Sequence, residues 1–129
     1  MADSRHRIST PHAPAAIGPY SQGIRSGDLL FTSGQIALDP KTGELIAGDV
    51  RAQAELVMEN LSAVLAAAET TFAHVVKSTI FLVDLGDFKV VNEVYGSRFE
   101  GTAPPARSTV QVAALPRGAK VEIELIARL

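Results

Sequence analysis

The chain has 129 residues, no cysteine, and 12 basic against 14 acidic side chains, which gives a net charge of −2. This length suits a single domain over residues 1–129, and the missing cysteine excludes disulfides, thiolate nucleophiles and Cys-ligated zinc. The acidic balance, without any run of Lys or Arg, argues against nucleic acid as the main partner.

The first ten residues, MADSRHRIST, lack the apolar core of a signal peptide, and no later segment is long enough to span a bilayer. We therefore expect a cytoplasmic protein with no membrane partner. His6, His12 and His74 are too scattered to form a metal-ligand pair, so no metal site is predicted. We interpret the segment that holds His6 and His12 as a mobile, exposed tail.

The first half of the chain predicts two strands and a helix. Residues 24–38, IRSGDLLFTSGQIAL, hold two short apolar runs around SGD, which is typical of a hairpin, and DPKTGEL at 39–45 reads as a second turn. Asp49 is placed to cap a helix. Apolar residues recur along one face of that helix, at Val50, Ala54, Val57, Leu61, Val64, Leu65 and Ala68.

The second half predicts a strand, a helix and two further strands. Residues 75–83, VVKSTIFLV, are apolar on both faces, which indicates a central strand covered on each side. A helix starts at Asp87 and is ended by Gly101. Residues 106–115 and 120–129 are joined by PRGA, so we expect a terminal hairpin. The apolar face of the helix consists of Phe88, Val91, Val94, Tyr95 and Phe99.

The resulting order, β-β-α-β-α-β-β, predicts an α+β fold in which two helices cover one face of a mixed sheet. Hydrophobic residues make up 47% of the chain, which is high for a small domain. Because two helices can cover only one face, we expect other copies of the chain to bury the opposite face.

Charged residues on the last two strands raise the question of a site. Arg107 shares one face of its strand with Thr109, whereas Glu122 and Glu124 share the polar face of the next strand. An arginine is charged at any accessible pH and needs an anion when it is buried. Glu122 or Glu124 of the same chain could supply that anion, as could the carboxylate of a ligand. The spacing leaves both alternatives open.

Polar residues also interrupt apolar segments elsewhere. Tyr20 in GPYSQG and Ser33 in FTSGQI offer hydroxyls, while Gly34 permits close backbone approach. Asn92 and Tyr95 fit a surface residue and a core residue as well as they fit a binding pair. Each motif alone is weak, and only their joint occurrence points to a site.

Four segments together resemble the RidA (YjgF) family of reactive-intermediate deaminases: APAAIGPYSQG, LFTSGQI, VVKSTIFLVDLGDF and PARSTVQVAALPRGAKVEIELIA. The resemblance covers nearly the whole chain. It implies a chorismate-mutase-like α+β fold and a homotrimer with ligand sites between subunits. It also implies hydrolysis of 2-iminobutanoate, 2-iminopropanoate and their enamine tautomers, released by pyridoxal-phosphate enzymes, to 2-keto acids and ammonia. No cofactor is implied.

The resemblance also assigns roles to residues. Arg107 of PARS would bind the substrate carboxylate, and Glu122 of VEIE would hold or activate the attacking water. The backbone N–H of Thr109 would bind a carboxylate oxygen. The remaining implied cleft residues are Tyr20, Ser33, Gly34 and Asn92.

Three positions depart from the family pattern. Thr109 stands where many relatives have cysteine, Pro104 where an aromatic residue is common, and Glu69 where a glycine is common after the first helix. Two alternatives to an enzyme stay open: a sensor that binds 2-keto acids without turnover, for which Arg107 would suffice, and a holdase-type interaction protein. A ribonuclease fits poorly, because the chain lacks a basic patch and a His/Lys catalytic set.

Overall fold

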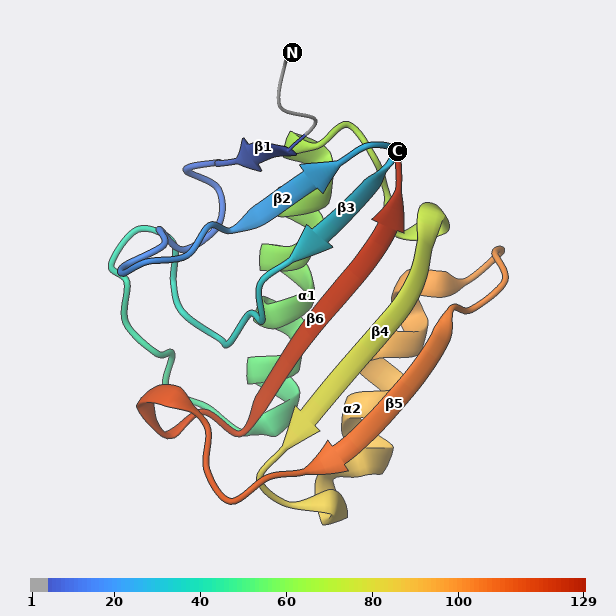
Figure 1. Ribbon diagram of the computed structural model, residues 1–129. Helices are drawn as coiled ribbons and strands as arrows, with labels where there is room; N and C mark the ends of the chain where they lie inside the picture. The colour runs from blue at the N-terminus through green and yellow to red at the C-terminus, as the bar shows by residue number, and fades with distance from the viewer. Residues whose placement is uncertain (1–4) are drawn as a thin grey trace.

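The computed structural model describes residues 5–129, which form a six-stranded sheet with two α-helices on one face (Figure 1). Across the sheet the strand order is β1-β2-β3-β6-β4-β5, and only the β4–β5 pair is parallel. The predicted α+β architecture is confirmed. The elements are β1 (Arg5–Ile8), β2 (Gly23–Ser26), β3 (Leu29–Thr32), α1 (Val50–Ala67), β4 (Val75–Leu82), α2 (Phe88–Gly96), β5 (Ala106–Gln111) and β6 (Val121–Arg128).

The β2–β3 hairpin forms around SGD as predicted, with Ser26 paired to Leu29. The predicted mobile tail is wrong for residues 5–8, because these residues form strand β1. This strand pairs with the edge of the hairpin and places His6 opposite Arg25. Its side chains are mostly exposed, so the sequence RHRI carries no apolar pattern that could have indicated a strand. His6 and His12 are exposed as predicted, and residues 1–4 of the expected tail lie outside the described residues.

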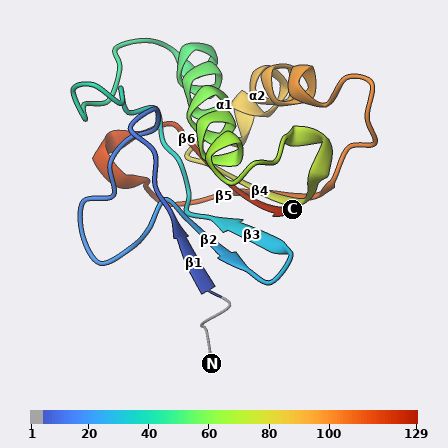
Figure 2. The same ribbon diagram turned by 90° about the horizontal axis from the view of Figure 1, so that it is seen from above.

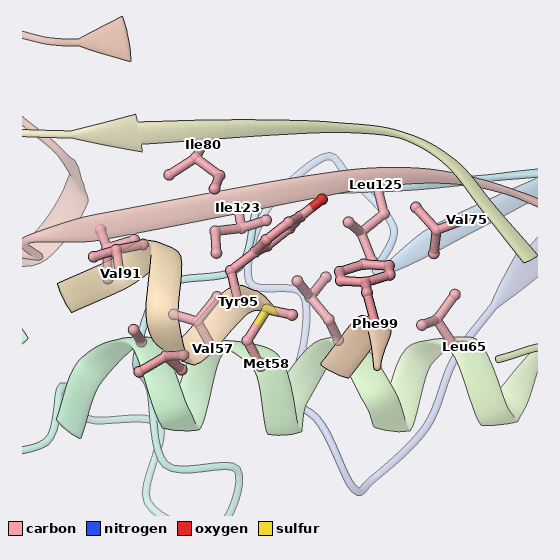
Figure 3. Close-up of a cluster of buried hydrophobic side chains, with 14 of the residues drawn as sticks. Val57, Met58, Leu65, Val75, Ile80, Val91, Tyr95, Phe99, Ile123 and Leu125 are labelled. Atoms are coloured by element: carbon pink, nitrogen blue, oxygen red, sulfur yellow. The ribbon is translucent and has the colours of Figure 1, made fainter. Parts of the chain in front are cut away.

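Helix α1 follows the predicted pattern. The Asp49 carboxylate accepts a hydrogen bond from the Ala52 N–H at 2.9 Å, so the predicted cap is confirmed. The predicted apolar face is buried apart from the half-buried Val50. Both helices lie on the same side of the sheet (Figure 2), and Figure 3 shows side chains from both helices meeting those of β4 and β6 in one core.

Helix α2 is shorter than predicted. It ends at Gly96 and continues as a 3-10 turn over Ser97–Phe99, and Gly101 follows with a left-handed φ of 78°. Val91, Tyr95 and Phe99 of its predicted apolar face are buried, whereas Phe88 is 41% exposed. The predicted start is confirmed, since Asp87 immediately precedes the helix.

The predicted terminal hairpin is wrong. Strand β5 pairs in parallel with β4, while β6 runs antiparallel between β3 and β4, so β4 separates the last two strands. A parallel pair joined through a helix is the ordinary β-α-β unit, here β4-α2-β5. Strand β6 is fully buried at every second residue, which suits an interior place in the sheet. Alternation along a strand sets its faces but does not choose its neighbours.

The sheet face that carries no helix holds several exposed apolar side chains. Phe31 of β3 and Val110 of β5 are both 42% exposed, and Phe81 of β4 is half-buried. The expectation that β4 is covered on both faces therefore does not hold within one chain. Among residues 5–129, neither helix has the length and apolar character that a membrane span requires.

Candidate functional site

A cavity of about 560 Å³ lies beside the start of β6. Its walls come from residues 14–22 and 33–38, from a turn that contains Pro116 and Arg117, and from Glu122. The cavity therefore brings together four of the residues predicted for the site, which are Tyr20, Ser33, Gly34 and Glu122.

The carboxylate of Glu122 lies directly against Gly34. A Cβ atom built on Gly34 would lie 2.8 Å from Cδ of Glu122, closer than real Cβ contacts come, so a larger residue at position 34 would displace the carboxylate from this position. Burial raises the pKa of Glu122, and the negative charge of Glu124 raises it further. Arg107 is not among the groups that act on this pKa. Burial thus prevails, and the Glu122 carboxylate is a stronger base than an ordinary glutamate.

Gln22 holds one wall of the cavity in place. Its side chain is 4% exposed, and its amide nitrogen donates to the carbonyls of Thr10, Ala13 and Pro14 at 3.0, 3.2 and 2.8 Å. The Thr10 N–H in turn donates to its amide oxygen at 2.7 Å. The predicted ligand hydroxyl of Ser33 likewise donates to its own chain, at the carbonyl of Ser21.

Arg107 lies on β5, at the edge of the sheet, and α2 fixes its position. Its Nη1 donates to Oδ1 of Asn92 at 2.7 Å, and its guanidinium carbon lies 5.0 Å from the ring centroid of Tyr95 and 5.5 Å from that of Phe88. The Tyr95 hydroxyl donates to Oγ of Ser78 at 2.7 Å, which anchors that ring. The guanidinium is therefore oriented before any ligand arrives.

Thr109 lies on the same face of β5 as Arg107. It borders a small cleft together with Arg107, Asn92 and Phe88. Its Oγ1 atom is buried and has no hydrogen-bond partner among the described residues. An unsatisfied buried hydroxyl is uncommon in folded proteins.

Arg107 and Glu122 lie on opposite faces of the sheet. Arg107 is in register with Ser78, which contacts α2, whereas Glu122 is in register with Phe81 on the helix-free face. The alternative of an ion pair between Arg107 and Glu122 or Glu124 of the same chain is therefore wrong. Within residues 5–129, no carboxylate lies at ion-pair distance from Arg107.

Two contributors to these surroundings were not singled out from the sequence. Phe88 was read only as a core residue, and Arg117 only as part of the PRGA turn. Their long-range contacts, Phe88 with Arg107 and Arg117 with Gly43, have no short-range sequence signal. No group of three His, Asp or Glu side chains in the described part of the chain could hold a metal ion.

Comparison with known proteins places this geometry in a family. The sequence model described as Endoribonuclease L-PSP matches residues 10–129, and among the relatives is the 2-iminobutanoate/2-iminopropanoate deaminase of Mus musculus, 50% identical over 95% of this chain and 90% of the relative. The chain belongs to the RidA (YjgF) family. A second member, Protein DfrA of Myxococcus xanthus, is 64% identical over 96% of this chain and 95% of its own length.

Solved RidA-family structures share the fold. YyfA of Yersinia pestis superposes with a TM-score of 0.95 at 48% identity and covers 97% of this chain and 99% of that one. TdcF of E. coli, solved with bound serine, gives a TM-score of 0.91 at 48% identity over 96% of this chain and 98% of that one.

Proposed function

We propose that this protein hydrolyses 2-imino acids and their enamine tautomers, such as 2-iminobutanoate and 2-iminopropanoate, to 2-keto acids and ammonia in the cytoplasm. The observation that carries the proposal is the cavity in which Glu122, with a raised pKa, lies against Gly34. The names of the mammalian relatives support the reaction.

Arg107 binds the substrate carboxylate in this proposal. A planar guanidinium matches a carboxylate with two parallel hydrogen bonds, and Asn92 and the two aromatic rings keep it in one orientation. The backbone N–H of Thr109 offers a further donor beside it.

Glu122 positions and deprotonates the water. The water oxygen adds to the carbon of the protonated imine while one water proton passes to Glu122, and Glu122 then returns this proton to the nitrogen of the tetrahedral adduct. The C–N bond breaks, ammonia leaves, and the remaining hydroxyl proton passes to Glu122 as the 2-keto acid forms. A protonated imine is already electrophilic, so orientation and proton transfer suffice and no cofactor is required.

The two residues can meet one substrate only if they come from different copies of the chain, because within one copy they face opposite sides of the sheet. We therefore propose a homotrimer with its sites between subunits, in which the helix-free faces pack together. Light scattering should return three times the chain mass of 13.6 kDa, and a folded monomer at micromolar concentration would contradict the assembly.

The function is tested by trapping the imine. A dehydratase generates 2-iminobutanoate in the presence of semicarbazide, and the loss of semicarbazone formation reports hydrolysis. Arg107→Ala should abolish hydrolysis and 2-keto-acid binding, because it removes a charge-assisted contact. Glu122→Gln should keep binding but lower turnover by about 10²-fold, because an amide cannot accept the proton. The exposed Arg25→Ala and Glu55→Gln are matched controls that should behave as the unaltered protein.

The outcomes separate the alternatives. Full hydrolysis by Glu122→Gln would remove Glu122 from the mechanism. Tight 2-keto-acid binding by the unaltered protein without any hydrolysis would favour the sensor.

A further inference from the structure

Arg117, an arginine other than Arg107, lines the same cavity as Glu122. Arg117 and the preceding Pro116 line its wall, together with Ser33 and Gly34 across the cavity. Arg117 belongs to the connection between β5 and β6, which passes beside the 35–48 loop (Figure 1). Arg117 is exposed, and it brings a permanent positive charge to the wall of this cavity, in the same chain as Glu122 and apart from Arg107 on the opposite side of the sheet.

The chain holds Arg117 in an unusual backbone conformation. Its φ of 63° and ψ of 13° are left-handed, a region that residues with a side chain rarely adopt. Its Nη1 atom donates to the carbonyl of Gly43 at 3.1 Å, which ties the turn to the 39–45 loop. The guanidinium is therefore held at one point, while its other N–H groups remain available to a ligand.

Nothing in the described chain neutralises Arg117. The ion pairs among residues 5–129 join Arg51 to Glu93 and Arg98 to Glu59, so no carboxylate lies within ion-pair distance of Arg117. Arg117 is also not among the groups that act on the pKa of Glu122. The cavity thus carries an acid and a cation at separate points of its wall.

The size of the cavity leaves room between them. Its volume of about 560 Å³ falls in the range of about 300–1,000 Å³ typical of sites for drug-sized ligands. A four-carbon imino acid would leave much of this space unfilled. A longer substrate would direct its side chain away from the imine carbon at Glu122 and along the remaining wall.

We propose that Arg117 is a subsite for a second anionic group, so that the cavity favours 2-imino and 2-keto acids whose side chain ends in a carboxylate. This inference rests on the proposed function, since it assumes that the imine carbon lies near Glu122. It adds a substrate class: dicarboxylic imino acids, bound at the 2-carboxylate by Arg107 of a neighbouring copy and at the far carboxylate by Arg117.

The test compares two ligands of equal carbon number that differ at one end. Calorimetric titration measures the dissociation constants of 2-oxopentanoate and of 2-oxoglutarate, which carries a carboxylate in place of the terminal methyl group. We expect the unaltered protein to bind 2-oxoglutarate about tenfold more tightly, as one charge-assisted contact allows. Arg117→Gln should remove this preference and leave 2-oxopentanoate binding unchanged, whereas Arg117→Lys should keep part of it.

Arg25→Gln is the matched control, because Arg25 is exposed on β2, bonds to the carbonyl of Gly27, and lines none of the described cavities. It makes the same change in net charge and should keep the preference. A preference absent from the unaltered protein, or unchanged in Arg117→Gln, would overturn the inference. Equal weakening of both ligands by Arg117→Gln would also overturn it, because Arg117 would then bind the carboxylate that the two ligands share. If neither ligand binds the unaltered protein, the proposed function fails with it.

Discussion

The two halves of the candidate site differ in how the chain prepares them. At the edge of the sheet, Arg107 is held by contacts from α2, through one hydrogen bond with Asn92 and the faces of two aromatic rings. On β6, Glu122 has no partner of opposite charge among residues 5–129 and lies against the backbone of Gly34 in a cavity. Arg107 is thus a cation with a fixed orientation, whereas Glu122 is a carboxylate whose pKa is raised by burial.

This difference assigns a separate task to each half. In the proposed mechanism the fixed guanidinium binds a carboxylate that is present throughout the reaction, so we expect Arg107 to contribute to binding. A carboxylate with a raised pKa acts when a proton moves, so it contributes to turnover. Because the halves face opposite sides of one sheet, the proposed mechanism requires two copies of the chain for one complete site.

The largest effect is expected at Gly34. In Gly34→Ala the new methyl group would overlap the Glu122 side chain, whose flexible end must move while the backbone stays in place. A displacement of this size in a catalytic group costs about 10²-fold in rate, so turnover should fall by that factor while 2-keto-acid binding changes little. Steady-state kinetics and calorimetry measure the two quantities.

Gly96→Ala serves as the control for Gly34→Ala. No atom lies within 4 Å of a Cβ built on Gly96, so this variant should keep full activity. Full activity in Gly34→Ala as well would show that the close approach of Gly34 to Glu122 has no role in the reaction.

A smaller effect is expected at Asn92, on the other half. Asn92→Ala removes the hydrogen bond that orients Arg107, and 2-keto-acid binding should weaken by about tenfold, as for one bond to a charged group. The rate at saturating substrate should change less than in Gly34→Ala. Glu93→Ala, which removes only an exposed ion pair with Arg51, should leave binding unchanged. An unaltered dissociation constant in Asn92→Ala would contradict the orienting role.

The pH dependence of activity tests the role of Glu122 alone. Glu122 must be ionised to accept a proton, so activity should rise with pH through its pKa, above the range of an ordinary glutamate. Glu124→Gln removes a neighbouring negative charge that raises this pKa, and the rise in activity should therefore move to lower pH. A profile that does not move would show that Glu122 does not control this step.

The same pKa predicts a stability effect. Because the folded state holds the Glu122 proton more tightly than the unfolded state, this group contributes stability at low pH that is lost as pH rises through its folded pKa. At neutral pH, Glu122→Gln should therefore unfold at a higher denaturant concentration than the unaltered protein. Lower stability at that pH would contradict the raised pKa.

The smallest effect is expected at Glu69, which belongs to neither half of the candidate site. Glu69 follows α1 with a left-handed φ of 62°, and the Thr70 N–H donates to the carbonyl of Leu65 at 3.0 Å in the usual helix-end pattern. Glu69→Gly should relieve the strain and stabilise the fold by about 1 kcal/mol, with no change in turnover. Denaturant unfolding measures the change, and an equal loss of stability would contradict the strain.

Sequence patterns anticipated what depends on local order. Asp49 caps α1, SGD forms its hairpin, and Glu122 faces away from the helix layer, because each follows from spacing along one segment. Strand β1 was not predicted, because its side chains are mostly exposed and show no alternation of apolar and polar residues. The supposed terminal hairpin was wrong because alternation does not choose a strand's neighbours.

The motifs named the residues of the candidate site, but local patterns did not predict how the fold arranges them. Motifs selected Arg107 and Glu122, yet their separation by β4 depends on the order of strands in the sheet. The contact of Gly34 with Glu122 and the hydrogen bond of Asn92 with Arg107 join segments that are far apart in the sequence. Such contacts follow from tertiary packing, which no local pattern records.

The most direct test of a site shared between copies is a mixing experiment. Arg107→Ala, which is expected to be inactive, and Glu122→Gln, which is expected to lose about 10²-fold in turnover, are refolded together in equal amounts, and imine hydrolysis is measured. An intact Arg107 then meets an intact Glu122 from a neighbouring copy in about a quarter of the clefts of a randomly mixed ring, so about a quarter of the unaltered activity should return. A mixture that assembles but stays as inactive as its two components would contradict the shared site.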